Sequence, residues 1–326
     1  MPLFDLPQDQ LEAYGGGVSS PPDFDEFWSG TMTDAARFDL DISLEPVETG
    51  LSVFETFDVT FAGFGGQPVR AWLHLPAGAA NVPVVVQFVG YGGGRGLPHE
   101  SIMWPAVGVA SLIMDTRGQG SGWSIGETAD PAGSAPAHPG FMTRGILDRD
   151  DYYYRRVFID GVRAVGVACA QSRIDSTRVA LFGASQGGGI ALAVAGLVPD
   201  VVSLVMCDVP ALCDFPRAVD LAEQIPYLEI VNYLSVHRGR RDEVLRTLSY
   251  FDGVLLGARG RAPGFFSIAL MDRVCPPSTQ YAAYNAYGGP KELALYHYNG
   301  HEGGGALHQA RQIDWLRRRW RLGTTS

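Results

Sequence analysis

Short, continuous apolar segments recur along most of this chain and alternate with segments of helical pattern. The apolar segments are rich in β-branched residues and have the length of strands that are buried on both faces. They read VPVVVQFV, ASLIMD, RVALF, VSLVMC, FFSIALMD and ELALYHY, over 82–89, 110–115, 178–182, 202–207, 265–272 and 292–298. Helical patterns cover 151–170 and 189–198. Strands that alternate with helices predict an α/β fold with a mostly parallel central sheet and helices on both of its faces.

Two segments nearer the N-terminus show a period of two instead. Apolar and polar residues alternate over 53–61 and again over 69–75, and the Gly-rich stretch 62–68 lies between them. This pattern predicts an antiparallel hairpin.

The remaining segments are predicted to be helical additions to the sheet. The first fifty residues (1–50) read as an N-terminal arm, with a helix in the segment PPDFDEFWSGTMTDAARF. A more polar helical segment at about 215–250 interrupts the alternation, so we expect a lid-like insertion above the carboxyl ends of the strands. A last helix, in the second half of 301–320, closes the chain.

The composition fits a large globular chain. Of 326 residues, 46% are hydrophobic, which is enough for a sizeable core, and we expect a single domain over 1–326. The formal net charge of -10 argues against nucleic acid or an anionic membrane as a partner. No apolar run approaches the ~18 residues of a membrane-spanning helix. The N-terminus lacks the basic start and apolar stretch of a signal peptide, so we expect a cytoplasmic protein.

The four cysteines change this picture little. Cys169, Cys207, Cys213 and Cys275 show no paired spacing, and three of them lie in or beside apolar runs. This distribution predicts buried thiols rather than a disulfide framework or a zinc site, and no metal or cofactor is expected.

One turn contains a motif that indicates catalytic chemistry. The stretch LFGASQGGGI has the pattern G-x-S-x-G at Gly183, Ser185 and Gly187, between the predicted strand 178–182 and a predicted helix. A bare match of this kind is equally consistent with a Gly-rich turn and an idle serine. The strand before it and the helix after it favour a nucleophile, because such a bend exposes the hydroxyl at the end of the sheet.

A serine nucleophile needs a base and an acid. His301 lies in NGHEGGG, just past the last predicted strand, and is the candidate base; the alternative is a surface loop histidine. Asp208 and Asp272 both end apolar runs after Ser185, and both give the chain order Ser, Asp, His of the α/β-hydrolases. The chain order therefore fits either aspartate as the acid, and the longer apolar run before Asp272 favours Asp272.

Ester hydrolysis also needs donors for the developing oxyanion. The N–H of Gln186, directly after the nucleophile, is one candidate, and the N–H of Tyr91 in VGYGGGRG is the other. The alternative interpretation of VGYGGGRG is a flexible Gly loop. This segment lacks the spacing of a phosphate-binding motif. Arg117 and Gln119 follow another predicted strand in MDTRGQGSGW. Arg117 is interpreted as a clamp for loop carbonyls near the site, with binding of an anionic substrate as the alternative.

With these segments in view, the sequence resembles the acetyl xylan esterase / cephalosporin C deacetylase family, carbohydrate esterase family seven, of the α/β-hydrolase superfamily. The likeness extends over nearly the whole chain and is far more specific than G-x-S-x-G. It runs through LFDLPQDQLEAY, PPDFDEFW, DTRGQGSGW, FMTRGILDRDDYYYRRVFIDGVRA, GASQGGGIALA, CDVPALCDFPRAV, TLSYFDG, MDRVCPPSTQYAAYN and NGHEGGG.

The resemblance implies a role for each candidate. Ser185 would be the nucleophile, Asp272 the acid and His301 the base. The oxyanion hole would be formed by Tyr91 and Gln186. The RGQ signature is matched by Arg117 and Gln119, as structural residues near the site. Val89 departs from the histidine found there in some members, which leaves the pocket edge open.

The resemblance also implies the biology. We expect a cytoplasmic, metal-free deacetylase of small acetylated sugars and related acetate esters, assembled as a homo-hexamer. Two other classes stay open. A peptidase of the same fold usually needs acidic residues for a free amine, and none can be assigned here. A hydrolase-like binding protein without catalysis would be expected to lack the serine or the histidine, and this chain has both.

Overall fold

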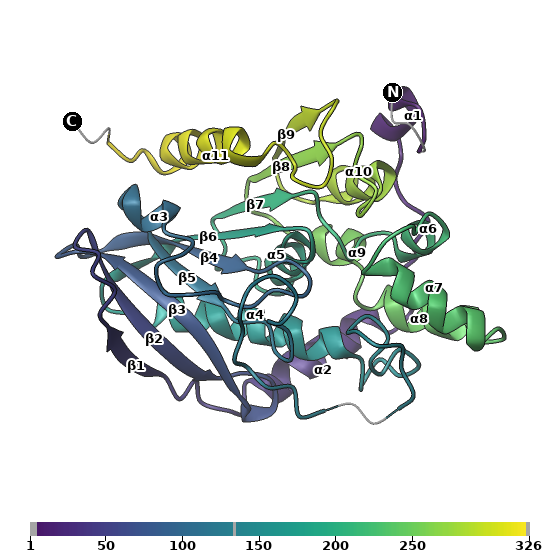
Figure 1. Ribbon diagram of the computed structural model, residues 1–326, viewed down its shortest axis with the longest axis horizontal. Helices are drawn as coiled ribbons and strands as arrows, with labels where there is room; N and C mark the ends of the chain where they lie inside the picture. The colour runs from purple at the N-terminus through teal and green to yellow at the C-terminus, as the bar shows by residue number, and fades with distance from the viewer. Residues whose placement is uncertain (1–4, 133–134, 324–326) are drawn as a thin grey trace.

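The centre of the molecule is a mixed sheet that organises everything around it (Figure 1). The structure is a computed structural model that describes residues 5–132 and 135–323. Within these residues the sheet has nine strands in the order β1-β2-β3-β5-β4-β6-β7-β8-β9. Their bounds are β1 Ser43–Val47, β2 Phe54–Ala62, β3 Pro68–Pro76, β4 Val82–Phe88, β5 Ala110–Met114, β6 Ile174–Ala184, β7 Leu204–Asp208, β8 Gly264–Ala269 and β9 Lys291–Tyr296.

The strand directions confirm the predicted fold class. The strands from β5 through β4, β6, β7 and β8 to β9 are parallel neighbours. The predicted hairpin is formed by β2 and β3, and β1 and β5 also pair antiparallel with it. The short strand β1 falls inside the predicted N-terminal arm and was not anticipated, since its residues are mostly exposed and show no apolar alternation.

Helices cover both faces of the sheet, and each face has its own apolar cluster (Figure 1). On one face lie α2 (Phe24–Ala35), α4 (Tyr153–Cys169), α5 (Gln186–Leu197), α9 (Gly253–Gly257) and α10 (Pro277–Ala286). On the other lie α3 (Met103–Ala106) and α11 (Gly305–Trp320), with Trp104 and Trp315 packed against the strands. The strands β4, β5, β7 and β8 are buried along their whole length, which is why they read as continuous apolar runs.

Several further helices lie in the segments that the sequence predicted to be additions to the sheet. The predicted insertion contains α6 (Phe215–Asp220), α7 (Tyr227–Val236) and α8 (Arg241–Ser249). The predicted arm contains α1 (Gln8–Glu12) and α2, and the short η1 (Phe64–Gly66) joins β2 to β3. Residues 1–4 of that arm lie outside the described residues. No helix within 5–132 or 135–323 is long and apolar enough to cross a membrane.

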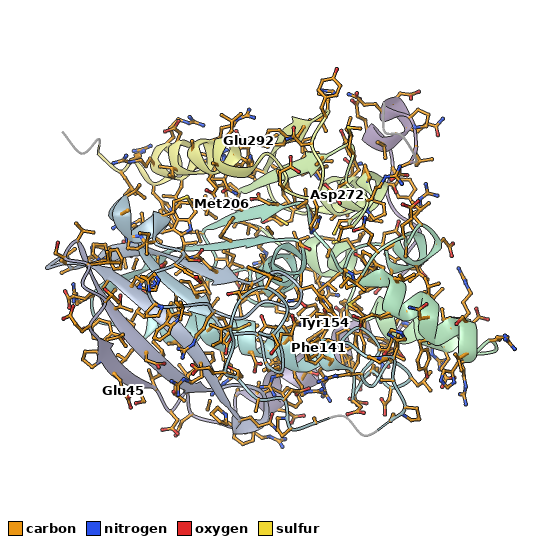
Figure 2. The ribbon with its side chains drawn as sticks, viewed as in Figure 1. Glu45, Phe141, Tyr154, Met206, Asp272 and Glu292 are labelled. Atoms are coloured by element: carbon orange, nitrogen blue, oxygen red, sulfur yellow. The ribbon has the colours of Figure 1, made fainter. Side chains whose placement is uncertain are left out.

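Two strand ends differ from the sequence prediction in a way that concerns the site. β8 ends at Ala269, so Asp272 lies in the turn beyond it (Figure 2) rather than at the strand end. Asp208, the other candidate, is the last residue of β7. β9 ends at Tyr296, which leaves His297 just outside the strand in which it was predicted to lie. Asp208 thus lies closer to a strand end than Asp272 does, so strand position does not select Asp272 and the contacts of the two side chains have to decide.

Candidate active site

Ser185 occupies a strained bend between β6 and α5. Its backbone has φ 57° and ψ -124°, a conformation that costs free energy and survives only where the surroundings enforce it. Two hydrogen bonds do so: the Ser185 N–H donates to the Asp208 carbonyl at 2.9 Å, and the Ala211 N–H donates to the Ser185 carbonyl at 2.9 Å. The loop after β7 thus holds the serine at the carboxyl ends of the parallel strands.

The glycines of this bend are required by space. A Cβ added to Gly183 would overlap the backbone of Gly187, and one added to Gly187 would overlap the carbonyl oxygen of Phe88. Gly189 lies in the same way against the carbonyl of Ala211. The start of α5 therefore packs directly on the backbone of its neighbours, and this close packing exposes the serine.

His301 and Asp272 are brought together, as the sequence predicted. The Nδ1 of His301 lies 2.8 Å from Oδ2 of Asp272, which is fully buried. Asp272 is itself held by N–H donors: Val274 and Cys275 donate to Oδ1 at 2.8 and 3.0 Å, and Gln280 Nε2 donates to Oδ2 at 3.0 Å. The carboxylate is thus fixed, and the bond through Nδ1 leaves Nε2 of His301 as the free ring nitrogen.

Asp208 belongs to a different network. Its Oδ1 lies 3.0 Å from Nε2 of His308, a buried residue of α11, and its carboxylate also accepts hydrogen bonds from Gln312 at 2.9 and 3.0 Å. The hydroxyl of Tyr296 lies 3.0 Å from the other ring nitrogen of His308. Asp208 is therefore already partnered away from His301, and this contact geometry separates the two aspartates where chain order did not.

Ser185 and His301 line the same cavity, of about 440 Å³. Tyr91 and Val89 form part of its wall, and Ile225 and Pro226, just before α7, form another part. Of the sequence-predicted residues, Asp272 and Gln186 lie behind this wall and contact His301 and Val89, which line the cavity. Gln119 and Arg117 lie further back, in contact with Gly92 and Tyr153.

The Tyr91 ring is anchored on both sides. Its hydroxyl donates to Glu229 Oε1 at 2.6 Å and accepts a hydrogen bond from the Phe141 N–H at 2.7 Å. The other oxygen of Glu229 accepts from the Met142 N–H at 3.1 Å. Burial raises the pKa of the Glu229 carboxyl group, and the hydrogen bond from Tyr91 opposes that shift.

The main chain of this loop is held by two glutamine amides. Gln119 accepts a hydrogen bond from the Gly92 N–H at 2.7 Å and donates to Gln186 Oε1 at 2.8 Å. Gln186 in turn donates to the carbonyl of Val89 at 3.1 Å. Because the acceptor is the main-chain carbonyl of residue 89, the identity of the side chain at position 89 does not alter this hydrogen bond. Among the described residues, none accepts a hydrogen bond from the N–H of Tyr91, so this N–H is free to bind a ligand.

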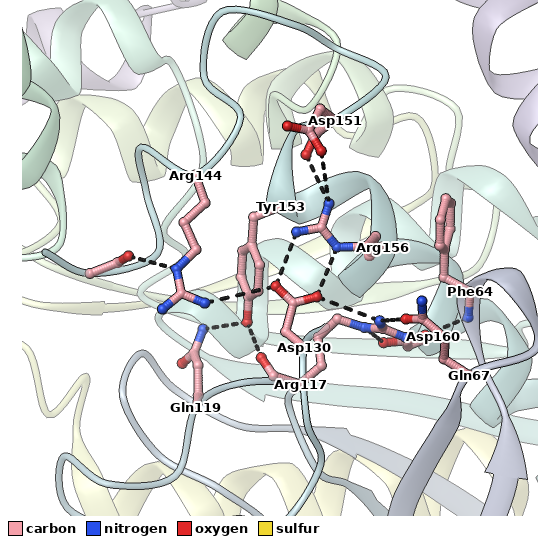
Figure 3. A network of polar contacts seen from close by, with 11 residues as sticks. Phe64, Gln67, Arg117, Gln119, Asp130, Arg144, Asp151, Tyr153, Arg156 and Asp160 are labelled. Carbon is pink, nitrogen blue, oxygen red and sulfur yellow. Dashed lines mark hydrogen bonds and ion pairs between the residues drawn. The ribbon is translucent and has the colours of Figure 1, made fainter. Parts of the chain in front are cut away.

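Arg117 lies in a network of polar contacts with residues that include Asp160 and Gln67 (Figure 3). The side chain is fully buried and makes a bidentate pair with Asp160, at 2.5 and 2.8 Å, and donates to Gln67 Oε1 at 2.5 Å. Its side chain thus contacts carboxylates and an amide, not the loop carbonyls that were expected, and it does not reach the cavity. Its own carbonyl accepts from the Tyr153 hydroxyl at 2.5 Å, and Gln119 donates to the same hydroxyl at 3.0 Å.

One group of side chains could in principle hold a metal ion. Ligand atoms of Asp272, Cys275 and His301 lie within 4.8 Å of one another, a cluster that sequence spacing did not predict. The donor chemistry fits a metal poorly. Burial raises the pKa of the Cys275 thiol well above its ordinary value, although a hydrogen bond with Ser185 opposes this, so the thiolate form is disfavoured. The Nδ1 of His301 is also already bound to Asp272.

Sequence reasoning missed two residues that shape the site. Glu229 is a single acid in the otherwise apolar start of α7, YLEIVNYL, and that isolation was an available signal. Trp123 lies four residues after Gln119, lines the cavity and donates from Nε1 to the Tyr91 carbonyl at 2.8 Å. Its side chain packs over Gly93 yet remains 66% exposed.

Known proteins resemble this chain over most of its length. A family model described as acetyl xylan esterase matches residues 1–319. The structure of an acetyl xylan esterase from a Paenibacillus species is similar with a TM-score of 0.91 and 38% identity, covering 96% of this chain and 99% of that one. One from a Thermoanaerobacterium species gives 0.90 and 31%, covering 97% and 100%. The acetyl esterase Axe7A of Xylanibacter ruminicola is 26% identical over 290 residues, 87% of this chain, which spans 64% of that relative's length.

Proposed function

Because the chain belongs to the acetyl xylan esterase family, we propose that it is a serine esterase that removes acetyl groups from small acetylated substrates through an acyl-enzyme. The substrate class comprises acetylated xylo-oligosaccharides, cephalosporin C and short-chain acetate esters. The observation that carries the proposal is the 2.8 Å contact of His301 with buried Asp272, in a loop that lines the same cavity as the strained Ser185.

The proposed chemistry assigns one role to each side chain. The Ser185 hydroxyl oxygen attacks the acetyl carbonyl carbon while Nε2 of His301 takes its proton. Asp272 holds the ring through Nδ1 and stabilises the imidazolium that forms. His301 then returns the proton to the leaving alcohol oxygen. A water molecule, deprotonated by the same nitrogen, attacks the carbonyl carbon of the acetyl-serine ester. The bond between this carbon and the Ser185 oxygen breaks, His301 returns the proton to that oxygen, and acetate leaves.

Two backbone N–H groups are proposed to stabilise the negative charge on the carbonyl oxygen. One belongs to Gln186, in the first turn of α5, where a helix leaves its N–H groups without intrahelical acceptors. The other is the free N–H of Tyr91. The contacts of Gln119, Gln186 and Glu229 around residues 89–92 support this role, since they fix the loop before substrate binds.

The test is replacement of the nucleophile. We expect Ser185→Ala to lower kcat on p-nitrophenyl acetate by roughly 10⁵- to 10⁶-fold while the fold is retained, as for other triad serines. Circular dichroism melting would monitor the fold. A variant that kept a tenth of the activity would refute the proposed nucleophile, and faster cleavage of aminoacyl nitroanilides than of acetate esters by the wild-type protein would refute the substrate class.

A further inference from the structure

The cavity beside Ser185 extends further than an acetyl group needs. Its volume of about 440 Å³ lies in the range of about 300–1,000 Å³ that is typical of pockets for drug-sized ligands. Its inner wall contains Gln87 of β4, Ile113 of β5 and Phe182 of β6. These three residues are direct register neighbours, so they project from the same face of the sheet.

Gln87 is the polar residue among these three residues of the inner wall. Its side chain is only 8% exposed, and its Nε2 has no hydrogen-bond partner among the described residues. A buried amide donor without an acceptor destabilises the protein. Its register neighbours Ile113 and Phe182 are apolar and offer no acceptor of their own. A ligand that brings an oxygen atom to this point would satisfy the amide, and such isolated polar groups orient ligands in otherwise apolar pockets.

The distance from the nucleophile identifies which part of a substrate is involved. Phe182, the register neighbour of Gln87, precedes Ser185 by three residues, which corresponds to roughly 10 Å along an extended strand. The methyl group of an acetyl ester lies one bond, about 1.5 Å, beyond the carbonyl carbon. The acetyl group itself therefore does not reach Gln87. The contact belongs to an atom several bonds from the scissile ester.

The charge of the wall limits the chemistry of that atom. The described residues that line the cavity include no lysine or arginine, and His301 is its only titratable cation. A carboxylate at the inner end would be buried without a counter-charge, at a high cost. A neutral acceptor, such as an ether, hydroxyl or carbonyl oxygen, carries no such cost.

We propose that Gln87 forms a substrate subsite. Its Nε2 donates a hydrogen bond to a neutral oxygen atom of the substrate that lies several bonds from the ester carbonyl. The inference rests on the proposed function, because it takes Ser185 as the reacting group. The oxygen could belong to the alcohol part of the substrate or to a longer acyl group, and the test distinguishes these two sources.

The test compares pairs of esters of equal chain length, in which one ester has oxygen where the other has methylene. For the acyl side, the pair is p-nitrophenyl 4-methoxybutanoate and p-nitrophenyl hexanoate. For the alcohol side, the pair is 2-(2-methoxyethoxy)ethyl acetate and heptyl acetate. For each pair, the measured quantity is kcat/KM of the ether ester divided by kcat/KM of the alkyl ester. We expect Gln87→Leu to lower this ratio by about 3- to 10-fold in one of the two pairs, because the variant loses one hydrogen bond to the ether oxygen. The pair that responds identifies the side.

Matched variants keep the result specific. Ile113→Val changes the same wall without removing a donor, so its ratios should equal those of the wild type. Gln87→Met, unbranched like glutamine, replaces Gln87→Leu if the latter does not fold. Ratios that are unchanged by both Gln87 variants in both pairs would overturn the subsite and leave water as the partner of the amide.

Failure of the proposed function would look different. In that case wild-type activity on p-nitrophenyl acetate would not depend on Ser185. The subsite would still be measurable as binding, by calorimetry, of 2-(2-methoxyethoxy)ethanol to the wild-type protein. Weaker binding to the Gln87 variants supports the subsite independently of catalysis, and equal binding contradicts it.

Discussion

At the residue scale, two carboxylates illustrate how surroundings divide roles between chemically identical groups. Asp208 is the last residue of β7 and Asp272 lies in the turn after β8, and they contact histidine ring nitrogens at 3.0 and 2.8 Å. The difference lies in what the two histidines face. His301 lines the cavity beside Ser185, whereas His308 is buried in α11 against Asp208 and Tyr296. The former pair is available to a substrate and the latter pair holds a helix to the sheet.

This difference predicts unequal effects of the same substitution. Asp272→Asn should lower kcat by about 10⁴-fold, because the amide no longer selects the ring tautomer or stabilises the imidazolium. Asp208→Asn, the matched control, should lower kcat far less. Steady-state kinetics on p-nitrophenyl acetate would measure both. A larger loss in Asp208→Asn would show that the acid has been assigned to the wrong residue.

Glu229 provides a second prediction at this scale, on pH dependence. Its carboxylate accepts hydrogen bonds from Tyr91 and Met142, and burial raises its pKa, so protonation occurs at a higher pH than for an ordinary glutamate. The protonated form can no longer accept at both oxygens, and the anchor of the Tyr91 loop is weakened. We therefore expect kcat to fall on the acid side as Glu229 takes up a proton.

The sign of the stability effect separates this loss from unfolding. Because the folded-state pKa is raised, the native state binds this proton more tightly than the unfolded state does, and the contribution of Glu229 to the free energy of unfolding rises as pH falls. Glu229→Gln should cost roughly tenfold in kcat at neutral pH and remove this part of the acid limb. His138, Tyr91 and Tyr152, which interact electrostatically with Glu229, remain in the variant.

Tyr91→Phe is the control that identifies the route. If Glu229 acts through the Tyr91 hydroxyl, the double variant should be no slower than Tyr91→Phe alone, since both changes remove one shared interaction. Additive losses in the pH-resolved kcat would contradict this route and assign Glu229 a structural effect elsewhere.

At the scale of elements, the site depends on how closely α5 approaches its neighbours. The helix begins directly after Ser185, and its first turn packs on the main chain of β4 and of the loop after β7. Glycine is needed at these positions because a side chain would occupy space already filled by backbone atoms, which cannot rotate away. Ser185, the residue directly before the helix, lines the cavity.

Two glycine substitutions test this packing. An added Cβ at Gly187 meets the Phe88 carbonyl, so Gly187→Ala should lower the free energy of unfolding by about 1–3 kcal/mol or more and reduce activity. Gly30, inside α2, has nothing within 4 Å of an added Cβ. Gly30→Ala should therefore raise stability by about 0.5–1 kcal/mol, the ordinary gain of alanine in a helix. Urea unfolding measures both, and equal effects would contradict the packing argument.

At the scale of the whole molecule, the N-terminal arm is part of the core of its own chain. Phe24, Phe27 and Trp28 are between 1% and 7% exposed, and the Trp28 indole donates to the Tyr250 carbonyl at 2.9 Å. These aromatic residues therefore offer no surface to a second subunit. Two of the exposed apolar side chains, Trp123 (66%) and Ile225 (61%), line the cavity.

Assembly remains a proposal that rests on the family resemblance. We propose a homo-hexamer whose subunits enclose their cavities around a shared interior, in keeping with the closed symmetry of most soluble homo-oligomers. Light scattering should then give about six times the mass of one chain. Such an enclosure admits short acetylated oligosaccharides and excludes polymers. A monomer, or equal rates of acetate release from oligosaccharides and polymeric xylan, would contradict the enclosure and leave the Ser185 chemistry intact.

Much of this protein follows from the sequence by local rules. Apolar runs with intervening helical patterns predicted the parallel sheet, and alternation predicted the β2–β3 hairpin, because burial on one or two faces dictates side-chain period. The G-x-S-x-G turn located Ser185 between a strand and a helix for a related reason, since tight bends need glycine wherever they occur. The exposed strand β1 escaped these rules, because little burial constrains its sequence.

The tertiary structure alone decided what depends on distant residues meeting. Asp208 and Asp272 have similar sequence contexts, and only the positions of α11 and the 298–304 loop show which histidine each one contacts. Glu229 reaches Tyr91 across 138 residues of chain, and the empty hydrogen-bonding position of Gln87 exists only because β5 and β6 flank β4. Periodicity reports the face on which a residue lies; the partner across a folded interior is set by packing, which no local pattern encodes.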